Sequence, residues 1–467
     1  MPKTKIVCTI GPSSDSKEMI EKLIQAGMNV ARLNFSHGTH EEHRLKIEMI
    51  REISKKLNAH VAILQDLCGP KIRVGCIRDP GIKLEPGQTL ILTSTPMEGL
   101  GNRACVSYEK LPQEVKPGDV VMLADGLMEM VVEKTTDTEV HCNVITGGIL
   151  TSNKGINLPS GTISAPSITE KDKKDLAFGL DLDIDYVALS FVRSAKDINE
   201  VKNIIRNADK DTPVIAKIEK HEALKNIDDI IRSADGIMVA RGDLGVEIPL
   251  ETVPNIQKML IRKTNNEGKP VIVATQMLRS MCESPRPTRA EANDVANAVL
   301  DGTDAVMLSE ETASGRYPVK AVEFMAKIAE SAEQNYPHLK FLDIKPDSDI
   351  SASVAYAACD LADHLKVSAI VASTQSGFTA KLISSFRPKA SIIALSPDIK
   401  AVRRLALYWG CVPVHVDLLK GTDDMFEKGA NSALTVGHVA KGDLVIVTAG
   451  HPVEVAGTTN MIKVVEV

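Results

Sequence analysis

The sequence has few aromatic residues and no long apolar run. Of its 467 residues, 3% are aromatic and one is Trp, which argues against the stacking surfaces that bind single-stranded nucleic acid. Its formal net charge of −6 gives no basic footprint for nucleic acid. No apolar stretch approaches the roughly 18 residues of a membrane helix. We therefore expect no nucleic-acid partner and no membrane-spanning segment.

Closely spaced cysteines are also missing. The eight cysteines lie far apart and form no CxxC pair, which fits reduced core thiols better than a zinc site or a disulfide framework. The N-terminal residues enter an apolar strand at once, without a signal-peptide core. We expect a cytoplasmic protein. With 43% hydrophobic and 25% charged residues, the chain has an ordinary globular composition.

Eight short apolar segments occur in the first two-thirds of the chain, and helix-like stretches lie between most of them. Each segment is typical of a buried parallel strand. They cover residues 5–11, 30–37, 61–67, 186–192, 214–219, 236–243, 271–277 and 305–311. This alternation predicts a (β/α)8 TIM barrel, a fold in which the carboxyl ends of the strands build the active site.

Two further units are predicted around this barrel. Pro-Gly and Asp-Gly turns separate short alternating runs between the third and fourth strands, which is typical of β-hairpins. We expect an inserted small β-barrel lid at 68–154, between barrel segments 1–67 and 155–342. Strand-like and helix-like runs after residue 343 predict a C-terminal open α/β domain at 343–467.

The predicted strand ends carry polar residues suited to a metal and to phosphate. Residues two apart on a strand share a face, so we expect Lys217 to point with Glu219, and Arg241 with Asp243. The two carboxylates can each give an oxygen to Mg²⁺. The alternative is an ionic network in which both carboxylates pair with Lys217 and Arg241.

A cationic cluster is predicted at the same edge, formed by Arg32, Arg73, Lys217 and Arg241. Fixed positive charge is what phosphoryl transfer mainly needs from a protein. The hydroxyls of Thr275 and Ser309 can hold a water that protonates carbon. For either residue alone, the alternative is a hydroxyl bonded to nearby backbone.

The motifs TKIVCTIGPSS, ARLNFSHG, GPKIRVG, KIEKHEAL, ARGDLGVEIP, ATQMLRSM, PRPTRAE and GTTNMIKV resemble successive signatures of the pyruvate kinase family. The resemblance spans nearly the whole chain in order. It implies a barrel, a β lid and a C-terminal regulatory α/β domain, usually in a homotetramer. It also implies phosphoryl transfer from phosphoenolpyruvate to ADP, giving pyruvate and ATP in the last step of glycolysis.

The resemblance also implies roles for single residues. Glu219 and Asp243 would bind Mg²⁺ or Mn²⁺, and Lys217 would stabilise the phosphoryl group that Arg32 contacts. The substrate would be seated by Ala240, Arg241, Gly242, Asp243 and Thr275. Thr275 and Ser309 would order the proton-donating water. The nucleotide side would be formed by Arg73, Lys154, Asn34 and His37, although the residues alone give His37 no role.

Two features depart from the commonest pattern of the family. Many members hold K⁺ at positions that match Asn34, Ser36, Asp66 and Leu67, and carry Glu where this chain has Lys71 in GPKIR. An ammonium group can stand where a monovalent cation would sit, so K⁺ is not expected to be required. Glu310 in SEET replaces the commoner Gly, and we expect it to be tolerated.

A regulatory phosphate site is expected in the C-terminal domain. The loop STQSGFTA (373–380) follows a predicted strand and opens a helix, and AGTTN (456–460) is a second hydroxyl-rich loop. The proposed phosphate ligands are Thr374, Ser376, Gly377, Thr379, Gly457 and Thr458. Because Trp409 stands where some members carry a basic residue, a sugar monophosphate or AMP is favoured over a doubly phosphorylated sugar.

Two other functions remain open at this point. One is a Mg²⁺-dependent lyase or aldolase that acts on enolpyruvate, which would need neither Lys217 nor lid cations. The other is a non-catalytic sugar-phosphate sensor, which would retain the C-terminal loop and lose polar barrel residues. Fold alone does not decide between these alternatives.

Overall fold

The computed structural model describes residues 2–467 except 160, 162–163, 165, 339–340, 342–348, 419–420 and 451–457. Eight parallel strands close into a barrel in the order β1-β16-β15-β14-β13-β12-β3-β2, which confirms the (β/α)8 prediction. The strands are β1 (Lys5–Thr9), β2 (Val30–Asn34), β3 (Ala62–Asp66), β12 (Tyr186–Leu189), β13 (Val214–Ile218), β14 (Gly236–Ala240), β15 (Val271–Ala274) and β16 (Ala305–Leu308). Each ends before the last residue of its predicted segment.

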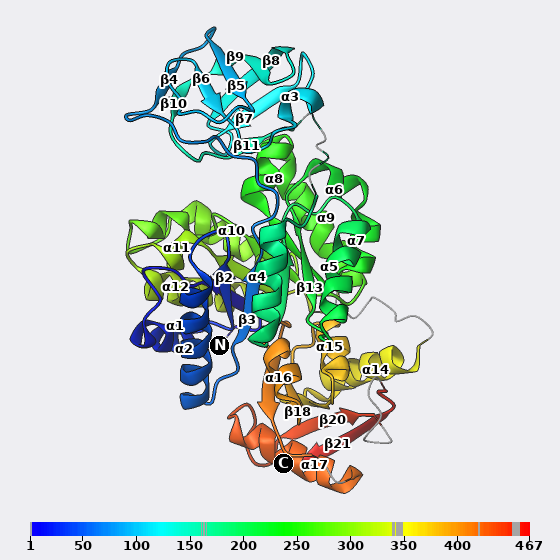
Figure 1. Cartoon of the computed structure of the whole chain (residues 1–467). Helices are drawn as coiled ribbons and strands as arrows, with labels where there is room; N and C mark the ends of the chain where they lie inside the picture. The colour runs from blue at the N-terminus through cyan, green and yellow to red at the C-terminus, as the bar shows by residue number, and fades with distance from the viewer. Residues whose placement is uncertain are drawn as a thin grey trace.

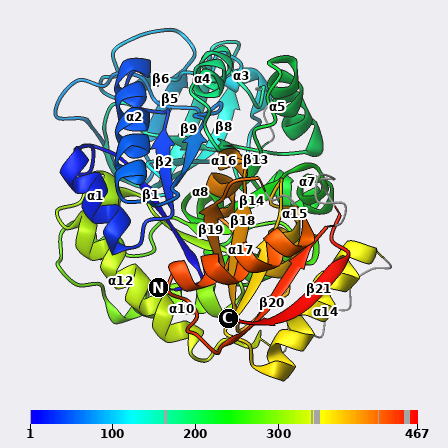
Figure 2. The same ribbon diagram turned by 90° about the horizontal axis from the view of Figure 1, so that it is seen from below.

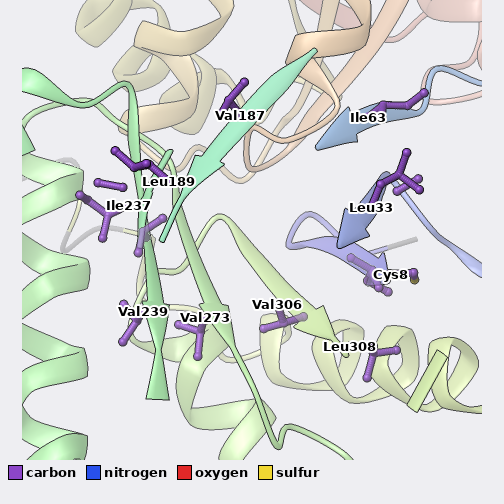
Figure 3. Close-up of a cluster of buried hydrophobic side chains, with 14 of the residues drawn as sticks. Cys8, Leu33, Ile63, Val187, Leu189, Ile237, Val239, Val273, Val306 and Leu308 are labelled. Atoms are coloured by element: carbon purple, nitrogen blue, oxygen red, sulfur yellow. The ribbon is translucent and has the colours of Figure 1, made fainter. Parts of the chain in front are cut away.

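Successive side chains on the barrel strands face opposite sides of the sheet. Outward residues such as Ile63 and Val273 pack in the large core between strands and helices, part of which Figure 3 shows. Inward residues such as Leu64 and Ile272 form a separate cluster in the barrel interior. Leu407, from the C-terminal domain, belongs to this inner cluster, so the interior is packed up to the neighbouring domain.

Helices surround the barrel, as Figure 1 shows. They are α1 (Lys17–Ala26), α2 (His40–Lys56), α4 (Glu170–Asp181), α5 (Ala195–Asn207), α6 (His221–Lys225), α7 (Ile227–Ser233), α8 (Arg241–Glu247), α9 (Val253–Asn266), α10 (Arg289–Leu300), α11 (Glu310–Ala313) and α12 (Pro318–Glu333). Capping boxes begin α2, α4 and α10 at Thr39, Thr169 and Thr288, which satisfies their first backbone N–H groups.

The segment after β3 forms a separate β domain with its own hydrophobic core. Its main sheet has the order β11-β7-β8-β9-β5-β6, and β10 pairs with β4. The elements are β4 (Ile82–Leu84), β5 (Thr89–Thr93), β6 (Arg103–Cys105), α3 (Leu111–Glu114), β7 (Val120–Leu123), β8 (Met128–Thr135), β9 (Glu139–Thr146), β10 (Gly148–Leu150) and β11 (Ile156–Asn157). The sheet thus extends just beyond Lys154, and the domain lies beyond the end of the barrel from which α8 starts (Figure 1).

The C-terminal residues form a five-stranded sheet of order β19-β18-β17-β20-β21, in which only β21 is antiparallel to its neighbour. Its elements are α14 (Ile350–Leu365), β17 (Ala369–Ser373), α15 (Phe378–Ser385), β18 (Ser391–Ser396), α16 (Ile399–Leu405), β19 (Cys411–His415), α17 (Thr422–Thr435), β20 (Leu444–Ala449) and β21 (Met461–Glu466). Seen from below in Figure 2, this domain lies across the barrel end opposite the β domain. Among the described residues, no helix has the length and apolar character of a membrane span.

Candidate active site

A cavity of about 900 Å³ lies at the carboxyl ends of the barrel strands, a volume within the usual range of ligand sites. It brings together residues that follow the ends of most barrel strands and residues of the β domain. Among the predicted site residues, its lining includes Arg32, Asn34, Ser36, His37, Lys71, Arg73, Lys217, Glu219, Asp243 and Ser309. Most of the candidate set therefore faces one space.

Asp66 is the centre of a buried ionic network beneath this cavity. Its carboxylate accepts from Arg32 Nε at 2.7 Å and from Lys217 Nζ at 3.1 Å. Arg32 also donates to the Thr9 hydroxyl, and Lys217 to the Ser190 hydroxyl. Burial alone would raise the pKa of Asp66, but Lys217 and Arg32 outweigh it and hold the pKa below its usual value. Asp66 is therefore the anion that orients both cations.

Lys217 also contacts Glu219, with 3.0 Å between Nζ and Oε1. Burial would lower the pKa of Lys217, but the carboxylates of Asp66 and Glu219 raise it above its usual value. The ammonium group therefore stays charged within the physiological pH range. It is a fixed positive charge at the floor of the cavity, as predicted from the strand alternation.

The carboxylate of Asp243 is close enough to affect the ionisation of Glu219. Burial and the Asp243 carboxylate raise the pKa of Glu219, and Lys217 lowers it. The net shift of the pKa is upward. Glu219 Oε2 accepts the Phe191 N–H at 2.7 Å, which leaves its other oxygen beside Lys217. Two neighbouring carboxylates on a polar cavity fit a hard divalent cation, because such ions take oxygen ligands.

Asp243 is paired with Lys71 rather than with Arg241. Lys71 Nζ lies 3.1 Å from Asp243 Oδ1 and 3.6 Å from Oδ1 of Asp125 in the β domain. Burial would lower the pKa of Lys71, but Asp243 and Asp125 raise it. The predicted alternative was an ionic network in which Lys217 and Arg241 neutralise both carboxylates. Lys217 does pair with Glu219, but Asp243 pairs with Lys71 instead of Arg241.

The prediction that Arg241 joins the cationic cluster is wrong. β14 ends at Ala240 and Arg241 is the first residue of α8, so strand alternation does not apply to it. Its guanidinium donates to Asp294 at 2.6 Å and to the Thr275 carbonyl at 2.8 Å. Arg241 thus ties α8 to α10 and to the end of β15, while Asp243, two residues later, faces the cavity.

Thr275 and Ser309 sit in unusual backbone surroundings at their strand ends. Thr275 has a positive φ of 72°, a strained conformation for a β-branched residue. Its hydroxyl accepts the Gly242 N–H at 2.8 Å and donates to the Ala274 carbonyl at 2.6 Å. The Ser309 N–H donates to Glu311, and Ser309 lines the cavity. For Thr275, the backbone-bonded alternative is the one observed.

The β domain contributes Arg73 and Asp125 near the cavity. Arg73 lines it and donates to the Asn153 carbonyl at 3.1 Å. Lys154 is exposed, and its carbonyl accepts the Val74 N–H. Asp125, in the turn between β7 and β8, was not predicted, because its pairing with the distant residue Lys71 leaves no local sequence signal.

The predicted monovalent-cation positions are bonded to one another or to the ionic network. Asn34 Oδ1 accepts the Ser36 N–H at 3.2 Å, and the Leu67 carbonyl accepts the Ser190 hydroxyl at 2.7 Å. Ser190 was not predicted. It follows a barrel strand like the other site residues, so the same strand-end pattern could have found it.

The C-terminal loops meet through two hydroxyls. Thr379 and Thr459 share a hydrogen bond of 2.7 Å in a buried position, and Gly377, the N-cap residue of α15, has a φ of 85°. Thr374 is nearly buried, Ser376 is exposed and Thr458 precedes Thr459. Gly457 lies outside the described residues. The two loops that were expected to bind phosphate are therefore neighbours.

Trp409 does not lie at those loops. It is fully buried before β19, where it packs on Tyr336 and accepts the guanidinium of Arg387 over its ring, 5.2 Å from the centroid. Its backbone N–H donates to Asp304 Oδ1 at 3.3 Å. Trp409 is part of the contact with the barrel, and the preference for a monophosphate effector stays a prediction.

The fold and the cavity define a (β/α)8-barrel enzyme whose site suits phosphate-bearing anions. Residues 1–322 match the family model "Pyruvate kinase, barrel domain", and residues 352–465 match "Pyruvate kinase, alpha/beta domain". Pyruvate kinase 2 of Synechocystis sp. is 50% identical over 99% of this chain and 79% of its own length. Pyruvate kinases of Staphylococcus epidermidis and Staphylococcus aureus are 48% and 49% identical over 99% of this chain and 80% of theirs. The chain belongs to the pyruvate kinase family and is a phosphotransferase.

Proposed function

We propose that this enzyme transfers the phosphoryl group of phosphoenolpyruvate to ADP with a divalent cation held by Glu219 and Asp243. The observation that carries the proposal is the placement of Lys217, whose charged Nζ lies 3.0 Å from Glu219 and faces the cavity. When bound, Mg²⁺ or Mn²⁺ would neutralise oxygen charge on the substrate. The family membership brings with it phosphoenolpyruvate, ADP, pyruvate and ATP as substrates and products.

The chain's own residues then have separate tasks. Lys217 and Arg32, both anchored by Asp66, supply fixed positive charge to the phosphoryl group in transit. The turn formed by Ala240, Arg241 and Gly242, held by Thr275, would seat the substrate carboxylate. Ser309 and Thr275 would order the water that protonates the enolate. Arg73, Lys154, Asn34 and His37 would face the nucleotide.

We further propose that the enzyme works without K⁺, because the ammonium group of Lys71 already supplies a monovalent positive charge beside Asp243. A phosphorylated effector, a sugar monophosphate or AMP, would bind the loops around Thr379 and Thr459 and regulate a homotetramer. The contact between these two loops supports that placement.

Pyruvate formation from phosphoenolpyruvate and ADP tests the central proposal. We expect turnover with Mg²⁺ in buffer free of Na⁺ and K⁺, and loss of turnover in Glu219→Gln. Release of inorganic phosphate or cleavage of a carbon–carbon bond, without ATP formation, would instead indicate lyase chemistry. No turnover in this buffer or in the same buffer with K⁺ added, even with sugar phosphates and AMP present, would indicate a sensor.

A further inference from the structure

A second large cavity lies between the barrel and the C-terminal domain, at the end of the barrel opposite the candidate active site. Its volume is about 800 Å³. Its walls come from the loops around β1 and β3 in the barrel, and from α16, β19 and the segment after α17 in the C-terminal domain. Figure 2 shows these C-terminal elements over the barrel end. None of the residues assigned above to catalysis or to the effector loops lines it.

The charged side chains that line this cavity are all basic. Its charged and titratable lining residues are Lys3, Lys5, Arg51, Lys55, Arg403, His60, His415 and His438, and no Asp or Glu is found among the described lining residues. The apolar part of the wall includes Ile24, Met28, Val412 and Val414. A site of this kind favours a molecule with negative charge and a neutral body.

Lys5 is a buried cation in the wall of this cavity. The residue is 6% exposed, and among the described residues its ammonium group has one hydrogen-bond acceptor, the Cys411 carbonyl at 2.6 Å. An ammonium group has three donors, and a buried charge is costly unless it is paired. Burial lowers the pKa of Lys5, which Cys411 and the carboxylates of Glu333 and Asp304 only partly offset. The remaining donors of Lys5 therefore need an acceptor.

The other cations are only partly compensated. Asp185 is shared between Arg51, at 2.8 Å, and Arg403, at 3.4 Å, so one carboxylate faces two guanidinium groups. His60 has no hydrogen-bond partner among the described residues. Burial lowers its pKa, and the nearby His415 and Arg403 lower it further. Positive groups that destabilise one another in this way would be stabilised together by a bound anion.

We infer that this cavity is a binding site for a small organic anion with at least two negative charges, such as a phosphate ester or a polycarboxylate. The anion would accept hydrogen bonds from Lys5, Arg51 and His60 of the barrel and from Arg403 and His415 of the C-terminal domain. It would therefore contact both domains at once. The site lies apart from the two hydroxyl loops and is a second anion site in the chain.

Direct binding to the full-length chain, without divalent metal and at low ionic strength, tests this inference. We expect isothermal titration calorimetry to show one site per chain for pyrophosphate, for citrate, or for both. Binding of pyrophosphate alone selects a phosphate ester, and binding of citrate alone selects a polycarboxylate. Binding of neither probe overturns the inference.

Variants locate the site. Lys5→Met, which keeps the aliphatic stem, is expected to weaken binding at least tenfold, and His60→Gln provides the same test if Lys5→Met does not fold. Lys116→Gln removes one exposed charge from the β domain and is expected to change the affinity less than twofold. Binding must also persist in Lys217→Met and Ser376→Ala, which alter the active site and the hydroxyl loop. Unchanged affinity in both Lys5→Met and His60→Gln overturns the inference, as does loss in either of the last two variants.

Discussion

The ammonium group of Lys71 lies 3.1 Å from the carboxylate of Asp243, and this contact joins the hinge of the β domain to the proposed metal site. Lys71 lies at the start of the β domain, and its second carboxylate partner, Asp125, belongs to the same domain. Residue 71 therefore supplies positive charge at a point where the domain, α8 and the cavity meet. The proposed independence from K⁺ depends on this charge being positive.

Lys71→Glu should make the enzyme dependent on K⁺. The substitution removes a cation from the cavity and adds an anion beside Asp243, so a monovalent cation becomes favourable there. We expect the parent to be fully active in tetramethylammonium buffer, and the variant to need added K⁺ for most of its activity. Steady-state pyruvate formation with and without KCl measures the ratio.

The matched control for that experiment is Lys83→Glu, which makes the same change on an exposed side chain of the β domain. It should leave the K⁺ response of the parent unaltered. If Lys71→Glu shows the same K⁺ response as the parent, Lys71 is only a hinge ion pair and the proposal fails.

Lys217→Met should lower kcat by about a hundred- to a thousandfold, the usual cost of removing one electrostatic contact to a transition state. It should also lower stability, because Asp66 and Glu219 each lose a buried partner. Breaking a buried pair costs about 3–5 kcal/mol. Turnover at saturating substrate and urea unfolding at pH 7 measure the two effects.

Lys202→Met is a suitable control for this variant, because Lys202 pairs with Asp235 in a half-exposed position on α5. Both turnover and stability should stay close to those of the parent. Turnover by Lys217→Met within a few fold of the parent value would remove Lys217 from the phosphoryl-transfer step.

The buried pair Arg387–Asp304 should contribute strongly to the docking of the C-terminal domain. Arg387 donates to both carboxylate oxygens of Asp304, at 2.7 and 2.9 Å, with both residues nearly inaccessible. Arg387→Met should cost about 3–5 kcal/mol in urea unfolding. The exposed pair Arg78–Glu98 is the control, since Arg78→Gln should cost less than about 1 kcal/mol. Equal costs for the two variants would contradict this assignment.

The barrel and the positions of Lys217 and Glu219 could be predicted from the sequence because β-strand periodicity is local. Apolar runs mark the strands, and residues two apart at a strand end share a face, so these two side chains had to point together. The position of Arg241 was predicted wrongly because the chain turns into α8 at that residue, where the two-residue periodicity of a strand no longer applies. The true strand end at Ala240 has no polar marker.

Contacts between domains could not be predicted in this way. Trp409 packs against Tyr336 of the barrel, and Lys71 of the β domain pairs with Asp243 of the barrel, but these residues lie far apart in the sequence. Their contacts depend on how complete domains dock, which no local pattern of the sequence encodes. The basic cavity between the domains was missed for this reason, since its cations are scattered from residue 3 to residue 438.

Acidification should destabilise the barrel partly through His43. This side chain stacks on Phe35, with 3.9 Å between ring centroids, and its Nε2 lies 2.9 Å from the His37 carbonyl. Its Nδ1 is buried without a partner. Burial lowers the pKa of His43, although the His37 carbonyl raises it in part. The folded state therefore binds the proton less readily than the unfolded chain, whose pKa is about 6.5.

The sign of the pH effect follows from this difference. Below about pH 6.5 the unfolded state binds more protons, so the free energy of unfolding must fall as the pH falls toward the folded-state pKa. His43→Gln can still donate to the His37 carbonyl and has no titrating group. It should lose less stability than the parent between pH 7.5 and 5.5 in urea unfolding, while the exposed control His364→Gln should lose as much as the parent. Equal losses in His43→Gln and the parent would mean that the proton binds elsewhere. Half-buried histidines whose pKa is lowered by burial, His338 first, would then have to account for the acid sensitivity.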